Sequence, residues 1–151
     1  MSESSVHLVK AVFLDRDGVI NRAITRDGLP YPPLSVDDFD VLPGVPEACR
    51  RLKAAGFVLV VATNQPDVGR GITTRELVDS IHAKMAETVT VDRVDACFHP
   101  GRGNSDCDCR KPKPGMLLRA ARELGIDLKQ SWMVGDRWRD VDCGKAAREV
   151  P

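Results

Sequence analysis

Short apolar stretches alternate along this chain with stretches that are apolar on one helical face. The apolar stretches are rich in β-branched and aromatic residues, and they predict buried strands at 9–14, 57–62, 94–98 and 132–134. Apolar residues at helical spacing predict helices at 45–55, 73–85 and 114–124, with another from about residue 140 onward. Segment 21–43 is rich in proline and glycine, so we expect an irregular surface segment with room for a small hairpin.

This alternation predicts an α/β fold of the Rossmann type, a parallel sheet with helices on both faces. The length of 151 residues suits a single domain spanning 1–151. In open sheets of this kind, ligands bind beyond the carboxyl ends of the strands. Polar residues at or just after such ends should therefore meet at one edge, and they are Asp15, Asp17, Thr63 and Asp136.

Charge and hydropathy exclude several kinds of partner. Lysine plus arginine and aspartate plus glutamate each number 22, so the formal net charge is zero. Such a chain has no long-range attraction to nucleic acid or to an anionic membrane, and an anionic ligand must be held by a few local cations. No apolar run is long enough to span a membrane, and the polar N-terminus lacks a signal peptide. We therefore expect a cytoplasmic monomer with no nucleic-acid or membrane partner.

Asp15 and Asp17 follow the first predicted strand, and Gly18 permits a sharp turn after them. Two carboxylates this close repel each other unless a cation lies between them. Mg²⁺ prefers such oxygen ligands, and Asp136 could supply a third. A carboxylate can also attack phosphorus, while a second carboxyl serves as general acid and base. The alternative is an ordinary acidic turn.

Lys111 lies in a basic, proline-rich segment, 110–115, just before a predicted helix. Phosphoryl transfer needs positive charge beside the phosphoryl oxygens, and prolines would hold the lysine in place. Thr63 could donate its hydroxyl to the same group. The alternatives are a solvated basic loop and a threonine that bonds the backbone.

Together these segments resemble the four ordered motifs of the haloacid dehalogenase superfamily of phosphatases. The motifs are Asp15-Arg16-Asp17-Gly18-Val19-Ile20-Asn21, Thr63-Asn64-Gln65, Lys111 and Gly135-Asp136, within a match from residue 11 to about 147. The resemblance implies a nucleophile at Asp15, a general acid and base at Asp17, and stabilisation of the transferring group by Thr63 and Lys111. It also implies Mg²⁺ bound by Asp15, the Asp17 backbone carbonyl and Asp136. Asn64 is assigned to substrate binding.

Motif spacing narrows the architecture further. Thr63 lies 48 positions after Asp15, and Lys111 lies 48 positions after Thr63. Sheet elements and loops fill both intervals, so neither leaves room for a separate cap domain. We expect an open site whose specificity is set by short loops.

A cluster of cysteines and one histidine predicts a second metal site. Cys97, His99, Cys107 and Cys109 supply the Cys₃His set that suits a closed, structural Zn²⁺ site. The alternative is that these are unrelated cysteines of a reducing compartment. The remaining cysteines, Cys49 and Cys143, fall on apolar helical positions and predict core packing, whereas His7 and His82 are expected at the surface.

The predicted zinc ligands and the residues after them resemble the heptose bisphosphate phosphatase family. The segment that carries this resemblance is Cys109-Arg110-Lys111-Pro112-Lys113-Pro114-Gly115-Met116. This resemblance implies that Arg110 and Arg137 bind a phosphorylated sugar, with a heptose 1,7-bisphosphate losing its 7-phosphate. The related histidinol-phosphatase domains share the same frame, so histidinol phosphate is the alternative substrate. The family continues with another strand and helix beyond the last motif, so a truncated, inactive zinc-binding domain is a third possibility.

Overall fold

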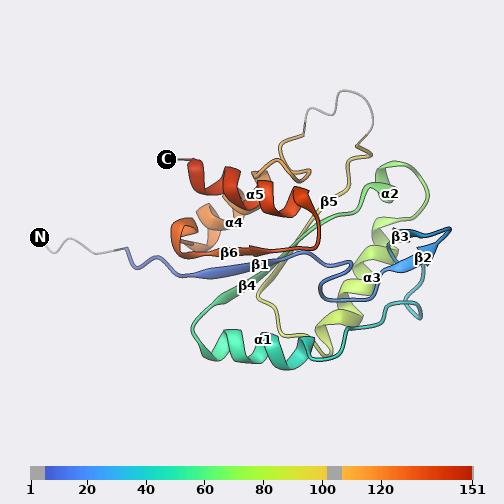
Figure 1. Ribbon diagram of the computed structural model, residues 1–151, viewed down its shortest axis with the longest axis horizontal. Helices are drawn as coiled ribbons and strands as arrows, with labels where there is room; N and C mark the ends of the chain where they lie inside the picture. The colour runs from blue at the N-terminus through green and yellow to red at the C-terminus, as the bar shows by residue number, and fades with distance from the viewer. Residues whose placement is uncertain (1–5, 102–106, 151) are drawn as a thin grey trace, which may run out of the picture.

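A four-stranded parallel sheet forms the centre of the protein. The computed structural model describes residues 6–101 and 107–150. The strands are β1 (Ala11–Leu14), β4 (Val58–Asn64), β5 (Arg93–Cys97) and β6 (Trp132–Val134), in the order β5-β4-β1-β6 (Figure 1). The predicted α/β fold is confirmed. The observed strands differ from the predicted ranges by no more than two residues at an end.

Helices cover both faces of the sheet, as predicted. α1 (Val45–Ala54) and α3 (Arg75–Ala86) lie on one face, and α4 (Gly115–Leu124) and α5 (Trp138–Glu149) lie on the other (Figure 1). Alternate residues of β1 point to opposite sides, so Val12 joins the core under α1 and α3, while Phe13 joins the core under α4 and α5. A strand buried on both faces needs a continuous apolar sequence, which explains the pattern at 11–14.

The predicted core cysteines, Cys49 on α1 and Cys143 on α5, are both buried. Three helix starts were misplaced, and the smallest difference is at α4, which begins at Gly115 and not at 114. α3 begins one residue after Thr74, whose hydroxyl accepts a hydrogen bond from the Leu77 amide, and not at 73. α5 begins at Trp138, ahead of the predicted start. The short helix α2 (Pro66–Gly69) and the 3₁₀ turn η1 (Leu128–Gln130) were not predicted.

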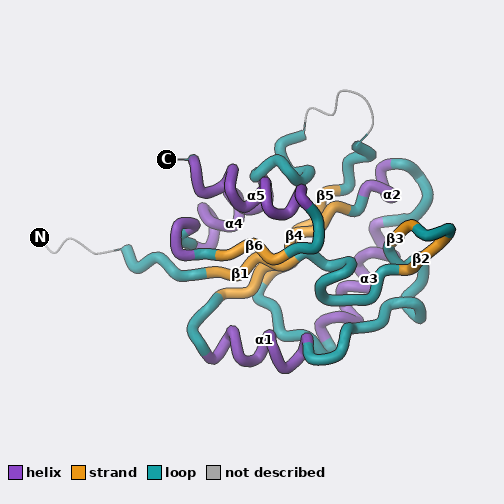
Figure 2. The backbone as a smooth tube through the Cα atoms, viewed as in Figure 1, coloured by secondary structure: helices purple, strands orange, loops and turns teal. Residues whose placement is uncertain are grey.

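The segment between β1 and α1 contains the expected hairpin. β2 (Ile24–Arg26) and β3 (Leu29–Tyr31) pair antiparallel, and Asp27 and Gly28 turn the chain with φ of 51° and 76° (Figure 2). Positive φ at both turn residues matches the twist of paired strands, and aspartate and glycine tolerate it. Within the described residues, no helix is long and apolar enough to cross a membrane.

Candidate active site

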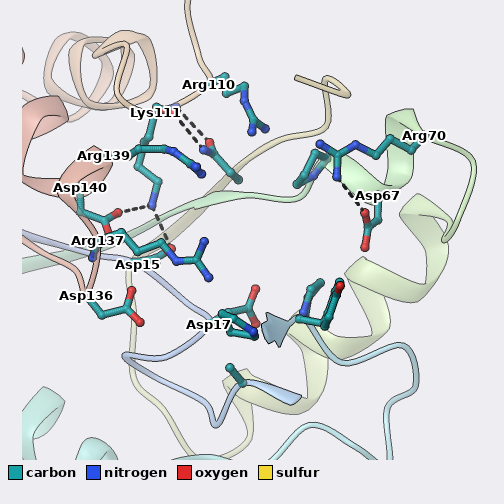
Figure 3. A pocket seen from close by; sticks show the side chains of 16 residues that line it. Asp15, Asp17, Asp67, Arg70, Arg110, Lys111, Asp136, Arg137, Arg139 and Asp140 are labelled. Carbon is teal, nitrogen blue, oxygen red and sulfur yellow. Dashed lines mark hydrogen bonds and ion pairs between the residues drawn. The ribbon is translucent and has the colours of Figure 1, made fainter. Parts of the chain in front are cut away.

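The carboxyl ends of the central strands surround a cavity of about 310 Å³. Asp15 follows β1, Asn64 ends β4, and Asp136 follows β6. The hairpin supplies part of the wall through Pro30 and Tyr31. Nearly all the site residues expected from the sequence therefore come together at one edge of the sheet (Figure 3).

Lys111 bridges two carboxylates at the base of this cavity. Its Nζ lies 2.9 Å from Asp15 Oδ1 and 2.7 Å from Asp140 Oδ1 (Figure 3). Lys111 is 3% exposed and Asp140 is 2% exposed, so water screens this charge group weakly. Asn64 fixes the loop that carries the lysine: its Oδ1 accepts from the Lys111 amide, and its Nδ2 donates to the Lys111 carbonyl. The amide of Asn64, predicted to bind substrate, thus positions Lys111.

Asp140 was not predicted as a site residue. It lies in the first turn of α5, and its Oδ2 accepts a hydrogen bond from the Arg137 amide at that helix's N-terminus. Its carboxylate faces Lys111 because Gly135 leaves room for it, since a Cβ at Gly135 would collide with the Asp140 side chain. An acid four residues after Asp136 on a predicted helix was the available signal.

The pKa of Asp15 is raised above its ordinary value. Burial is the main cause, and the negative charge of Asp140 acts in the same direction. The ammonium group of Lys111 opposes both by attraction and by its hydrogen bond. Lys111 therefore favours the ionised form that a nucleophile requires.

Replacing Lys111 with methionine should lower the free energy of unfolding by about 3 kcal/mol at neutral pH, because two buried carboxylates lose their counter-charge. The pKa of Asp15 would then rise further, so the folded state would bind protons more tightly than the unfolded state. Stability lost at neutral pH should consequently return as the pH falls toward the ordinary carboxyl pKa. Urea unfolding at several pH values, without added Mg²⁺, measures this.

The matched control is Lys113→Met, since Lys113 is exposed and donates to the Cys107 carbonyl. That variant should stay within about 0.5 kcal/mol of wild type. If Lys111→Met lowered the free energy of unfolding by the same amount at every pH, the assigned pairing of Lys111 with two carboxylates would be contradicted.

Three carboxylates are arranged to hold a cation. Oxygens of Asp15, Asp136 and Asp140 lie within 4.8 Å of one another. Gly18, at φ 89°, lets the loop after β1 pass beside Asp136, because a Cβ there would collide with that carboxylate. Asp136 is exposed, so an ion can reach the group. Oxygen ligands of this kind suit Mg²⁺.

Asp17 also lines the cavity, but its carboxylate belongs to a different group of contacts. It accepts hydrogen bonds from Arg16, Asn21 and Gln65. Thr63 is 1% exposed, and its hydroxyl accepts from the same Gln65 Nε2 at 3.0 Å. The predicted contact of Thr63 with a phosphoryl group stays a prediction, because Thr63 is not among the residues that line the cavity.

Several arginines line the cavity. Arg110 and Arg137 were predicted there, whereas Arg70 and Arg139 were not (Figure 3). Burial lowers the pKa of Arg110, and the charges of Arg139 and Arg70 lower it further, so these guanidinium groups are close enough to repel one another. Among the described residues, no partner hydrogen-bonds the buried NH1 of Arg110. An anion bound here would relieve the repulsion and satisfy that donor.

The cysteine cluster lies beside the arginines. Ligand atoms of Cys97, His99, Cys107 and Cys109 lie within 4.8 Å of one another. His99 Nδ1 is 3.2 Å from the sulfur atoms of both Cys97 and Cys109. Burial and the neighbouring thiols raise the pKa of Cys109 to about 12. Thiolates crowded in this way need a cation, and three sulfurs with one imidazole nitrogen fit a tetrahedral Zn²⁺.

Pro100 and Gly101, which follow His99, and Arg110, which follows Cys109, connect this cluster to the cavity. Arg70 Nε donates to the Pro100 carbonyl at 2.9 Å. The guanidinium of Arg110 lies against Gly101, where a Cβ would collide with it. The cysteine loop therefore holds the arginines that face the cavity.

A family model described as haloacid dehalogenase-like hydrolase matches residues 33–148. Two curated relatives are named D-glycero-beta-D-manno-heptose-1,7-bisphosphate 7-phosphatase. The protein from Pasteurella multocida is 40% identical over 148 residues, covering 92% of this chain and 77% of the relative. The protein from Escherichia coli K12 is 40% identical over 149 residues, covering 92% of this chain and 75% of the relative.

A solved structure gives the same picture in three dimensions. The crystal structure of D,D-heptose 1,7-bisphosphate phosphatase from B. bronchiseptica, complexed with magnesium and phosphate, superposes with a TM-score of 0.78 at 36% identity. The superposition covers 91% of this chain and 76% of that one.

Proposed function

Because this chain belongs to the haloacid dehalogenase-like hydrolases and is a phosphatase, we propose that it removes the 7-phosphate of a heptose 1,7-bisphosphate through an aspartyl-phosphate at Asp15. The names of the relatives support this substrate. The observation that carries the proposal is the ion pair between Lys111 and Asp15 in a cavity that arginines also line.

Asp15 would attack the phosphorus of the 7-phosphate while the bond from phosphorus to the sugar oxygen breaks. Asp17 would give a proton to the departing oxygen and later take one from the water that attacks the aspartyl-phosphate. Lys111 would stabilise negative charge on the phosphoryl oxygens. Asp15, Asp136 and the Asp17 carbonyl would hold Mg²⁺, with Asp140 alongside, and the bound ion would supply positive charge next to the phosphoryl group.

The arginines that line the cavity favour a substrate with a second anionic group. Lys111 and a metal ion can balance the charge of the reacting phosphate. The positive charges of Arg110, Arg139 and Arg70 are then available to bind a second anionic group. A guanidinium binds a phosphate through paired hydrogen bonds. Histidinol phosphate carries an ammonium group at the corresponding end, which these arginines would repel. Lys113 belongs to the same basic segment as Arg110 but does not line the cavity, so it is not assigned to substrate binding.

The test compares hydrolysis of heptose 1,7-bisphosphate, histidinol phosphate and p-nitrophenyl phosphate, with Mg²⁺ and after its removal. We expect the highest kcat/KM for the bisphosphate and no turnover without Mg²⁺. Arg110→Ala should lose about 1.5–3 kcal/mol more transition-state stabilisation on the bisphosphate than on the aryl phosphate, the range for a hydrogen bond to a charged group. Lys113→Ala is the control and should act alike on both.

Equal losses from Arg110→Ala on both substrates would contradict a role in recognition. Faster turnover of histidinol phosphate would replace the heptose with the alternative substrate. A folded, zinc-loaded protein that hydrolyses none of these compounds would indicate an inactive binding domain.

A further inference from the structure

The loop after β1 buries a guanidinium that the proposed chemistry does not use. Arg16 lies between the nucleophile Asp15 and the acid Asp17, and it is 0% exposed. A charge taken out of water is costly unless other groups pair with it. The partners of Arg16 therefore indicate what the charge is for.

Arg16 reaches two partners with opposite ends of its guanidinium. Its Nε and NH2 lie 3.1 and 3.0 Å from Asp17 Oδ1, and NH2 also lies 3.2 Å from Oδ2. On the other side, NH1 lies 3.0 Å from Nε2 of His82 on α3. A guanidinium only donates, so Nε2 accepts and the ring carries its proton on Nδ1.

The surroundings keep His82 in this neutral form. Burial is the main cause that lowers its pKa to about 4, and the charge of Arg16 lowers it as well. His82 is thus a partly buried acceptor on α3, and the prediction of a surface position for it was wrong.

Two buried amides complete the contacts of the Asp17 carboxylate. Asn21 Nδ2 donates to Oδ1 at 2.9 Å, and Gln65 Nε2 donates to Oδ2 at 2.8 Å. Oδ1 therefore faces more donors than Oδ2. A carboxylate has about four lone-pair sites, and four donor nitrogens of Arg16, Asn21 and Gln65 meet them, so these contacts fix its orientation. A proton on Oδ2 displaces fewer hydrogen bonds than a proton on Oδ1, so Oδ2 is the oxygen assigned to proton exchange.

We propose that Arg16, braced by His82, is the positioning residue that holds Asp17 in its orientation for proton transfer to the departing sugar oxygen. The inference rests on the proposed role of Asp17 as general acid and base. As the bond from Asp15 to phosphorus forms and the bond from phosphorus to the sugar breaks, the proton on Asp17 Oδ2 passes to the sugar oxygen. Asp17 is then ionised and takes the next proton from water.

His82 matters because it occupies the far side of the guanidinium. Without an acceptor there, buried NH1 would lose its hydrogen bond, and Arg16 could satisfy it only by turning away from Asp17. A shift of about 1 Å in a catalytic group can cost about a hundredfold in rate. The cost should fall on the step that needs the proton.

The experiment compares His82→Leu with His82→Gln, whose side-chain oxygen can still accept from Arg16. For each we measure kcat/KM on p-nitrophenyl phosphate, whose leaving group needs no proton, and on the sugar phosphate that the wild type hydrolyses best. Because kcat/KM ends at departure of the leaving group, later attack by water does not enter it. Ser80→Ala, an exposed change on α3, is the control.

We expect His82→Leu to lose about 10–100-fold on the sugar phosphate and less than about threefold on the aryl phosphate. His82→Gln should retain most of both activities, and Ser80→Ala should match the wild type. Arg16→Lys, which keeps the charge but loses the fork, should show the same split as His82→Leu.

Equal losses on both substrates in His82→Leu and Arg16→Lys would mean that the pair serves only folding, and the inference would be overturned. Unchanged sugar-phosphate turnover in His82→Leu would overturn it too. A wild type that prefers another sugar phosphate rejects the heptose but leaves the ratio between substrates as the test of this inference. A wild type inactive on every phosphate would overturn both proposals.

Discussion

Asp15→Asn should reduce phosphate release by at least about 10⁴-fold, in the range seen when other hydrolases lose their nucleophile. The substitution keeps the side chain's shape but removes the charge that attacks phosphorus. Lys111 would still pair with Asp140, so the folded structure should survive. Phosphate release from the bisphosphate with Mg²⁺ measures the loss, and circular dichroism checks that the variant is folded.

Asp17→Asn is the informative comparison, because it leaves the nucleophile in place. It should still transfer phosphoryl groups from aryl phosphates, whose leaving groups need no proton, while losing turnover of sugar phosphates. It also unpairs the buried Arg16, so we expect lower thermal stability than in Asp15→Asn. Near wild-type phosphate release by Asp15→Asn would contradict the assigned nucleophile.

Loss of zinc should have the second large effect. We expect one Zn²⁺ per chain, bound by Cys97, His99, Cys107 and Cys109. Metal binding to such a group contributes folding free energy. A loss of about 3 kcal/mol lowers the Tm of a domain of this size by about 6–12 °C. Chelation, or Cys109→Ser, should produce this shift in a thermal melt.

Catalysis should fall with zinc because the cysteine loop carries cavity residues. Lys111 follows Cys109 by two positions, and Arg70 and Arg110 rest on Pro100 and Gly101. The loss in kcat/KM should therefore be greater on the bisphosphate than on the aryl phosphate. Cys49→Ala is the control, because Cys49 is a buried cysteine in the core under α1 and should leave the zinc content unchanged. If elemental analysis found no zinc in the folded protein, the zinc assignment would be wrong.

The arrangement of Asp15, Asp136 and Lys111 was predictable because local rules govern it. Apolar runs end where the strands end, and parallel strands bring those ends to one edge of the sheet. Lys111 was predictable because prolines and an adjacent metal motif mark its segment. None of these inferences required knowing how distant helices pack.

The residues that sequence reasoning missed depend on such packing. Asp140 meets Lys111 only because α5 begins at Trp138 and turns its first acid inward. His82 meets Arg16 across 66 positions, which follows from how α3 packs beneath the β1 loop. Arg70 follows a short helix that has no clear periodicity in the sequence. Contacts of this kind depend on tertiary structure, and the spacing of Asp140 four residues after Asp136 was the one signal that the sequence offered for them.

Trapping the covalent intermediate tests the central claim most directly. Asp17→Asn protein is mixed with Mg²⁺ and an aryl phosphate, quenched in acid, and treated with borohydride, which reduces an aspartyl-phosphate to homoserine. Peptide mass spectrometry should find homoserine at position 15, and Asp15→Asn treated in the same way should give none. Phosphate release by the wild type with no modified residue at position 15, or with the label on another residue, would contradict the mechanism.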